Sequence, residues 1–150
     1  LAVAVKADNN SIHSVSDLAG KKVIVQTGTP STVEVPKHAQ GASLIPFATT
    51  PEGIKALEQG RGDAYIQDVD LLASMSSVDH NFKVVGGPFT QEPYGIGLKH
   101  GDDAMKKFVN DWLTQIYKSG LWAKVYKSTI GSVGETPVPP VPVIGSVPGS

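Results

Sequence analysis

The chain has 150 residues, a formal net charge of −1 and 40% hydrophobic side chains, enough for one domain with a real core or one domain and part of another. The near-neutral charge, without any lysine- or arginine-rich run, argues against nucleic acid, whose binding depends on neutralising phosphates. Cysteine is absent, which excludes disulfides and thiolate metal sites, and no apolar stretch is long enough to span a bilayer.

Strand and helix patterns follow one another along most of the chain, which favours an α/β fold with a mostly parallel sheet flanked by helices. We expect strands near residues 1–7, 22–26, 43–47, 63–67, 82–85 and 93–98. Helices are expected near residues 16–20, 30–38, 50–59 and 69–75, with Thr50 as the cap of the third helix. The chain begins inside a predicted strand, without an initiator methionine or a signal segment, and we expect it to be a piece of a longer protein.

The C-terminal third has a different character. From Asp102 apolar residues recur at helical spacing, and Gly120 separates this long predicted helix from a shorter one that opens at Leu121. We expect the aromatic residues of these helices to pack in a core or against another lobe, namely Trp112, Tyr117, Trp122 and Tyr126. Residues 132–150 are rich in proline and predict an extended, disordered tail.

Two strand ends carry the candidate binding chemistry. Residues 23–26 form a predicted buried strand that runs into Thr27-Gly28-Thr29 and then a helix, so backbone N–H and hydroxyl groups there can receive an anion. A later strand, residues 63–67, ends at the carboxylate of Asp68. If these strands are neighbours in a parallel sheet, their carboxyl ends share one crevice. The pattern then predicts a receptor for a zwitterion, with an anion site beside a cation site.

Each feature also has a simpler interpretation. Gly28 and Thr29 can form only a tight turn before a helix, and Asp68 can cap the helix that follows it. Asp68 and Asp70 can be considered as a metal site, but the glycine and distal glutamate of a calcium loop are absent, and we expect no metal. The histidines show no ligand spacing, and we expect all four to be solvated: His13, His38, His80 and His100.

Catalytic motifs are absent after the predicted strands. Neither the phosphate-binding Gly-x-x-x-x-Gly-Lys-Ser/Thr pattern nor the nucleophile pattern Gly-x-Ser-x-Gly occurs there. The candidate site residues are not paired with a visible histidine or lysine that could act as an acid or base. We therefore expect a binding protein without catalytic residues and without a cofactor.

Four ordered segments carry a resemblance to a known family. They are residues 1–31, which contain Val25-Gln26-Thr27-Gly28-Thr29, and residues 60–68, 92–99 and 120–127. Over residues 1–131 the chain resembles the solute-binding proteins of polar amino-acid ABC transporters, and the glutamine-binding subgroup is the most similar.

The resemblance implies a type II periplasmic-binding-protein-like fold, in which two α/β lobes joined by crossing strands close on an amino acid. Residues 1–7 and 93–98 would be the hinge strands, and residues 8–92 would form lobe 2, which binds the ligand. Residues 99–131 would be C-terminal helices of lobe 1. Most of lobe 1 would then be missing from the chain.

The resemblance also implies a set of ligand-binding residues: Gln26, Thr27, Gly28, Thr29, Ser31, Gln67 and Asp68. In this interpretation Thr29 donates to the carboxylate of the ligand, and Asp68 pairs with its ammonium group. The amides of Gln26 and Gln67 suit a neutral polar side chain better than a full charge, and glutamine or glutamate is favoured.

One residue departs from the family pattern. Pro30 has no N–H to offer where many relatives donate one to the ligand, and we expect Ser31 to replace that contact. The implied function is extracytoplasmic capture of a polar L-amino acid, in the periplasm or lipid-anchored at the outer face of the cell membrane. The implied partners are the amino acid, an ABC permease and the missing lobe 1. The alternatives are a ligand-sensing domain of an amino-acid receptor and an enzyme on the same bilobal fold.

Overall fold

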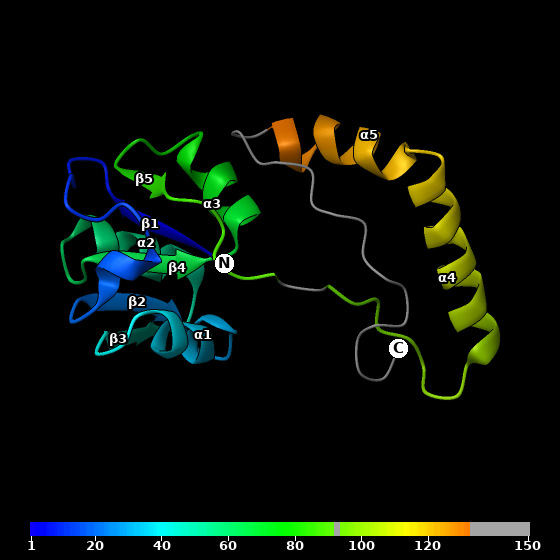
Figure 1. Ribbon diagram of the computed structural model, residues 1–150, viewed down its shortest axis with the longest axis horizontal. Helices are drawn as coiled ribbons and strands as arrows, with labels where there is room; N and C mark the ends of the chain where they lie inside the picture. Colours follow the sequence, from blue (N-terminus) through cyan, green and yellow to red (C-terminus); the bar gives the residue numbers. More distant parts are fainter. Residues whose placement is uncertain (92–93, 133–150) are drawn as a thin grey trace. The chain divides into compact units, whose positions relative to one another are not determined.

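The computed structural model describes residues 1–91 and 94–132 (Figure 1). The chain divides into two compact units, Leu1–Gln91 and Glu92–Ser150. From residue 133 onward the predicted proline-rich tail lies outside the described residues. In the described part of the chain, no helix combines the length and the apolar composition that crossing a membrane requires.

The first unit alternates strands and helices as the sequence predicts. Its strands are β1 (Ala2–Lys6), β2 (Lys22–Gln26), β3 (Ser43–Phe47), β4 (Ala64–Gln67) and β5 (Phe82–Val85). Its helices are the short 3₁₀ helix η1 (Val15–Leu18) and the α-helices α1 (Ser31–His38), α2 (Thr50–Glu58) and α3 (Val69–Ser76).

The five strands form one sheet in the order β3-β2-β4-β1-β5. β2 pairs in parallel with both β3 and β4, whereas β1 pairs antiparallel with both β4 and β5. The sheet is therefore mixed: β2, β3, β4 and β5 run in one direction, as the predicted mostly parallel sheet requires, and β1 runs in the other. Hydrophobic periodicity identifies a strand but not its direction, and the one reversed strand, β1, lies between two others and makes half of the pairings antiparallel.

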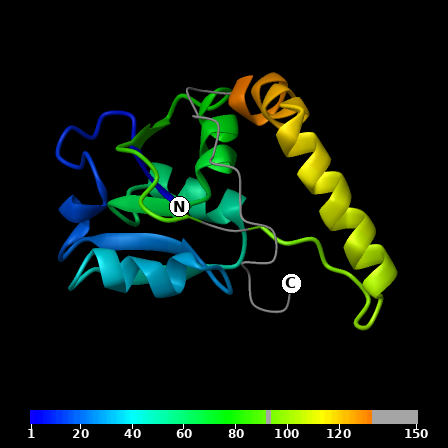
Figure 2. The same ribbon diagram turned by 45° about the vertical axis from the view of Figure 1, so that its right-hand side comes forward.

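Alternating side chains cover the two faces of this sheet, because successive residues of a strand point to opposite sides. Along β2, Val23 and Val25 belong to a core cluster that includes Val35 of α1, and Ile24 belongs to a second cluster. The second cluster contains fully buried side chains from α2 and α3, for example Leu57. Helices thus close both faces, as the alternation predicted (Figure 2).

Capping boxes open two helical segments: an acidic residue three positions after the N-cap accepts the backbone N–H of the N-cap residue. Thr49 caps α2, and the carboxylate of Glu52 accepts the N–H of Thr49 in return, at 3.0 Å. The cap is therefore one residue earlier than the predicted Thr50, because the spacing of three to Glu52 makes a capping box with Thr49. Before η1, the backbone N–H of His13 donates to Asp17 and holds the pKa of that carboxyl below its ordinary value.

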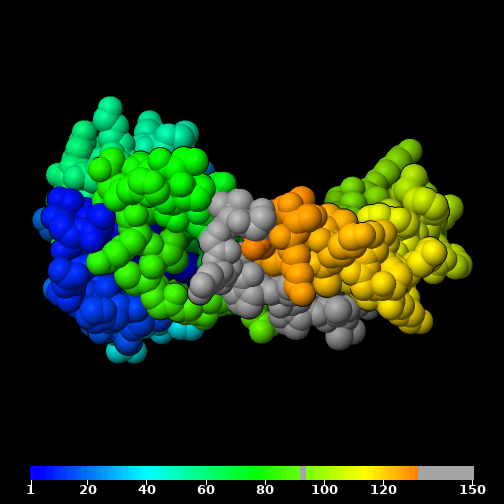
Figure 3. Space-filling view, turned by 90° about the horizontal axis from the view of Figure 1, so that it is seen from above, coloured from blue at the N-terminus to red at the C-terminus, as the bar shows by residue number. Residues whose placement is uncertain are grey.

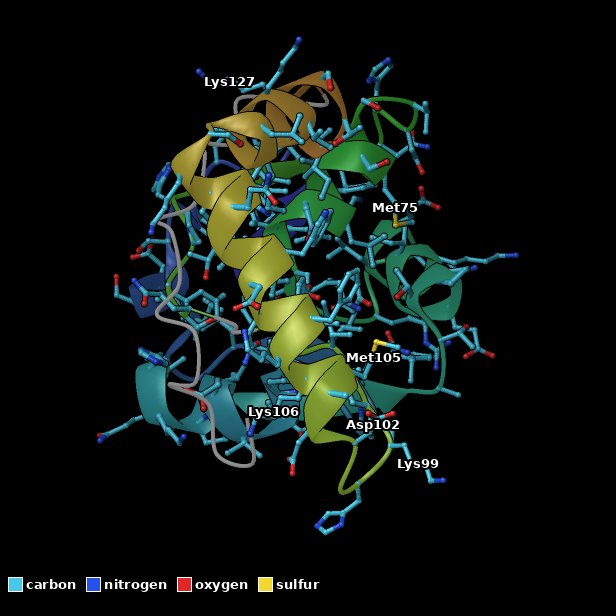
Figure 4. The ribbon with its side chains drawn as sticks, turned by 90° about the vertical axis from the view of Figure 1, so that its right-hand side faces the viewer. Met75, Lys99, Asp102, Met105, Lys106 and Lys127 are labelled. Carbon is cyan, nitrogen blue, oxygen red and sulfur yellow. The ribbon has the colours of Figure 1, made fainter. Side chains whose placement is uncertain are left out.

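The second unit is helical where it has regular structure. α4 (Asp103–Lys118) is capped by Asp102, whose carboxylate accepts the N–H of Met105 at 3.0 Å. Both residues are labelled in Figure 4. Gly120, in the left-handed region at φ 74°, separates α4 from α5 (Leu121–Ser128), and a 3₁₀ turn follows, η2 (Ile130–Ser132).

The strand predicted over residues 93–98 is not found. Residues 94–98 have no regular secondary structure, and residue 93 lies outside the described part. Residues 94–98 include the apolar side chains on which the prediction was based. A strand also needs a neighbouring strand to supply hydrogen bonds, however. All regular structure among the described residues of this unit is helical, so no strand is there to pair with.

Large apolar side chains of α4 and α5 are exposed. The exposed fraction is 66% for Phe108, 50% for Trp112 and 46% for Met105. Trp122 stacks on Tyr126 with ring centroids 5.3 Å apart and tilts against Tyr117 at 5.7 Å, whereas Trp112 is half exposed, so the packing of these aromatic residues in a core or against another lobe stays a prediction. The atoms of α4 and α5 are coloured yellow and orange in Figure 3.

Candidate functional site

The two strand ends that carry the candidate residues are neighbours. β2 and β4 pair in parallel with Val23 opposite Ala64 and Val25 opposite Ile66. The next residues, Gln26 and Gln67, therefore end the two strands at the same edge of the sheet. This is the arrangement on which the predicted zwitterion receptor depends, and the structure confirms it (Figure 1).

The turn after β2 is built around Gly28 and Thr29. Gly28 has φ +76°, a backbone conformation that residues with a Cβ rarely adopt. The hydroxyl of Thr29 donates to the carbonyl of Gln26 at 2.8 Å, and the N–H of Thr29 points to the same carbonyl at 3.4 Å. The hydroxyl of Ser31 then lies 2.7 Å from that of Thr29. The sequence thus forms a tight, internally bonded turn that leads directly into α1.

The hydroxyl groups expected to donate to an anion are engaged or buried, and the hydrogen-bond donors of the turn are mainly backbone N–H groups. The single hydroxyl hydrogen of Thr29 is used by the carbonyl of Gln26, and Ser31 is buried, with 1% of its surface exposed. In the first turn of α1, the N–H of Thr32 bonds to Thr29 and that of Val33 to Pro30. The N–H of Ser31 finds no acceptor among the described residues, as the first N–H groups of a helix lack intrahelical partners.

Asp68 follows β4 at the same edge. It occupies the N-cap position of α3, but its side chain makes no capping hydrogen bond, so the simpler interpretation of Asp68 as a side-chain cap does not hold. Its backbone carbonyl accepts the N–H of Leu72 at 3.0 Å. The side chain is half-buried, and Thr27 and Gly28 on the neighbouring turn are exposed.

The two predicted amide residues bond to each other. Gln67 Nε2 donates to Gln26 Oε1 at 2.9 Å, and also lies 3.1 Å from the hydroxyls of Thr50 and Tyr65. The hydroxyl of Thr50 donates to the same Gln26 Oε1 at 2.9 Å. We call Gln26, Thr50, Tyr65 and Gln67 the edge network. With 5% of its surface exposed, Gln67 lies beneath the edge, and of the two amides only that of Gln26 is partly open to solvent.

Sequence reasoning did not include Thr50 and Tyr65 in this site. Thr50 was expected as a helix cap, but because Thr49 takes that role, the Thr50 hydroxyl is available to Gln26. The strand order β3-β2-β4 holds the signal that could have found it: β3 also runs parallel to β2, so the residues that follow β3 reach the same edge. Tyr65 is fully buried and reads as an ordinary core residue.

Other candidate groups lie elsewhere. All four histidines are exposed, as expected. Residues 1–91 and 94–132 contain no cluster of three or more histidine, aspartate or glutamate side chains placed to hold a metal ion. A shallow hollow of about 360 Å³ is lined by Lys6, Ala7, Asp8, Glu58, His80 and Asn81. Because β1 is antiparallel to β4, Lys6 at the end of β1 marks the opposite edge of the sheet, and the hollow is separate from the candidate site.

Known proteins resemble the chain in sequence and in fold. No model of a protein family matches it. It is 35% identical over 122 residues to the ABC transporter glutamine-binding protein GlnH of Bacillus subtilis, a match that covers 81% of the chain and 45% of that protein. The solved structure of an ancestral arginine-binding protein bound to glutamine has a TM-score of 0.69 and 36% identity, covering 85% of this chain and 57% of that one.

A third match is to the solved structure of a single domain. The crystal structure of domain 2 from TmArgBP has a TM-score of 0.55 and 25% identity; the match covers 60% of this chain but 98% of that one.

The fold and these matches define the class of protein. The chain has the α/β lobe of type II, periplasmic-binding-protein-like structures. It is homologous to the amino-acid solute-binding proteins of ABC transporters, as its ordered segments predicted, and it spans about half the length of the curated relatives it matches.

Proposed function

We propose that the chain supplies lobe 2 and the C-terminal helices of a two-lobed protein that captures a polar L-amino acid and delivers it to an ABC permease. The observation that carries this proposal is the parallel pairing of β2 with β4, since it puts the turn Thr27–Ser31 and Asp68 at one edge. Homology to proteins named for glutamine binding supports the same function.

The ligand's two charged groups have separate places in this proposal. The carboxylate meets the turn before α1, where the N–H groups of Gly28 and Ser31 and the helix dipole favour an anion. The Thr29 hydroxyl gives up its hydrogen bond to the Gln26 carbonyl and donates to the ligand carboxylate instead. Asp68 accepts the ammonium group, a charge-assisted contact without which the buried charge would be costly.

The remaining parts of the proposal concern what lies beyond this lobe. Residues 1–7 and 93–98 join the lobes, and β1 in the first of these segments also lies in the sheet of lobe 2. Residues 8–92 form the rest of lobe 2, and residues 99–131 belong to lobe 1. The exposed apolar side chains of α4 and α5 support this division, because contiguous apolar faces commonly mark an interaction surface. The remainder of lobe 1 is the proposed partner for that surface, and the protein acts outside the cytoplasm, in the periplasm or anchored by a lipid.

Binding without catalysis fits the candidate residues best. The edge holds hydroxyls, amides and one carboxylate, and the described histidines are exposed elsewhere. The ligand-sensing domain of an amino-acid receptor would use the same site chemistry and is the second candidate function. Glutamine and glutamate are the favoured ligands.

Substitution of Asp68 tests this proposal. In the complete two-lobed protein, Asp68→Ala should weaken glutamine binding by about ten- to a hundredfold, since a hydrogen bond to a charged group contributes roughly 1.5–3 kcal/mol. Asp70→Ala, two residues further along in the first turn of α3, is the matched control and should change affinity less than about threefold. Isothermal titration calorimetry measures both. Unchanged affinity in a folded Asp68→Ala protein would contradict the ammonium site.

A further inference from the structure

The edge network has a fixed direction of hydrogen bonding at one end. The backbone N–H of Asp68 donates to Gln67 Oε1 at 3.0 Å, and a backbone N–H can only donate. The oxygen of the Gln67 amide is therefore held toward Asp68, and its Nε2 must face the other members of the network. That Nε2 lies 2.9 Å from Gln26 Oε1.

The other end of the network fixes the same direction. Gln26 Nε2 donates to the backbone carbonyl of Ala48 at 3.3 Å, and a carbonyl can only accept. Gln26 Oε1, on the opposite side of the amide, accepts from both Gln67 Nε2 and the Thr50 hydroxyl. Reversing the Gln26 amide would oppose its N–H groups to the donor of Gln67 and its oxygen to the carbonyl of Ala48.

The orientation decides what Gln26 can offer at the edge. An amide oxygen accepts about two hydrogen bonds, and both places on Gln26 Oε1 are taken, by Gln67 Nε2 and the Thr50 hydroxyl. Nε2 carries two hydrogens, of which the bond to Ala48 uses one, and this end of the side chain is exposed. Gln26 can therefore act toward a ligand as a donor and not as an acceptor.

We propose that the edge network makes Gln26 a fixed donor that selects amino acids whose side chain ends in an acceptor oxygen, an amide or a carboxylate, and disfavours guanidinium and ammonium side chains. This inference rests on the proposed function. A cationic side chain brings only donors, so it would leave its own donors and that of Gln26 unpaired in a closed site, which is costly. Selection between these ligands thus depends on Gln67 and Thr50, which hold the Gln26 amide, as much as on Gln26 itself.

The test compares two ligands in the complete two-lobed protein. Titration calorimetry with glutamine and with arginine should give an affinity at least about tenfold higher for glutamine. Gln26→Glu keeps an oxygen for Gln67 and Thr50 and replaces the outward donor by an acceptor with negative charge. In this variant the preference should reverse toward arginine.

A second pair of variants tests the network without changing Gln26. Thr50→Val removes the hydroxyl that donates to Gln26 Oε1, so the amide is less firmly held and the glutamine-to-arginine affinity ratio should fall. Thr50→Ser retains a hydroxyl and should retain the ratio. These variants decide the matter even if Gln26→Glu does not fold.

The outcomes separate this inference from the proposed function. Glutamine binding with equal or tighter arginine binding in the unmodified protein would overturn the inference and leave the proposed function in place. An unchanged ratio in both folded Gln26→Glu and Thr50→Val would also overturn it. If neither amino acid binds, the proposed function fails and the inference fails with it.

Discussion

The two units of this chain differ in how they bury their apolar residues. In Leu1–Gln91 the sheet is covered on both faces, and the apolar side chains of β1, β2 and β4 are inaccessible to water. In Glu92–Ser150 the described helices also carry large apolar residues, yet Phe108 and Trp112 are at least half exposed. Apolar residues thus complete a core in one unit and leave exposed apolar side chains on the helices of the other.

This difference indicates which unit has a complete hydrophobic core of its own. A closed core holds the strand ends of β2 and β4 in register, and with them the candidate site. An amphipathic helix without a covering partner gains little from its apolar face and depends on whatever packs against it. The site is therefore expected to keep its geometry in this chain, whereas α4 and α5 are expected to need another surface.

The largest expected effect comes from a core substitution in the first unit. Leu57 is fully buried between α2 and the sheet, and Leu57→Ala should lower the free energy of unfolding of that unit by about 2–5 kcal/mol. Phe108→Ala, at an exposed position of α4, should change it by less than about 0.5 kcal/mol. Urea titration followed by the NMR amide signals of β2 and β4 measures both.

Tryptophan fluorescence sharpens the same comparison. Both tryptophans of the chain, Trp112 and Trp122, lie in the second unit, so their fluorescence follows the unfolding of α4 and α5 alone. If the units are independent, Leu57→Ala leaves the fluorescence transition unchanged. A shift of both transitions together would contradict the division.

A smaller effect is expected in the turn of the candidate site. Gly28→Ala puts a Cβ at φ +76° and should destabilise the first unit by about 1 kcal/mol, although there is space for the methyl group. Gly87→Ala is the matched control, because Gly87 also has open space around it and no positive φ, and it should be nearly neutral. Equal stabilities of the two variants, measured by urea titration, would show that the turn is not held in the left-handed conformation.

The weakest effect concerns the open face of α4. Exposed apolar side chains favour association at high concentration, so sedimentation velocity should detect reversible self-association of the 150-residue chain. Phe108→Ser combined with Trp112→Ser should reduce it. Val78→Ser, which removes an 82% exposed apolar side chain from the first unit, should not. Association that persists in the double variant would mean that another surface is responsible.

Much of the first unit could be predicted from the sequence. The Val-Ile-Val run of β2 and the order of strands and helices identified the elements, and the helical spacing from Asp102 identified α4. The direction of β1 could not be predicted, because periodicity is the same for parallel and antiparallel strands. The strand expected at residues 93–98 is absent from the described residues 94–98 for a related reason, since pairing depends on a neighbour that a local pattern does not contain.

The candidate site was predictable in its position more than in its contacts. A turn after β2 and a carboxylate after β4 fall at one edge once the strands are parallel neighbours. The bond between Gln26 and Gln67 depends on the register that aligns Val25 with Ile66, and the role of Thr50 depends on Thr49 being the cap. The cap follows from the local spacing of Thr49 and Glu52, whereas the strand register is set by tertiary packing, which is why the two amides were expected to face a ligand when one of them lies beneath the edge.

One measurement tests the central claim, that this edge receives both charged groups of an amino acid. Titration of the isotope-labelled 150-residue chain with glutamine, followed by NMR, should shift the amide signals of Gly28, Thr29, Ser31 and Asp68 with a dissociation constant in the millimolar range. Binding should be that weak because micromolar affinity corresponds to about −8 kcal/mol, of which a lobe alone retains only part. Saturable shifts confined to the opposite edge, around Lys6 and His80, would contradict the account.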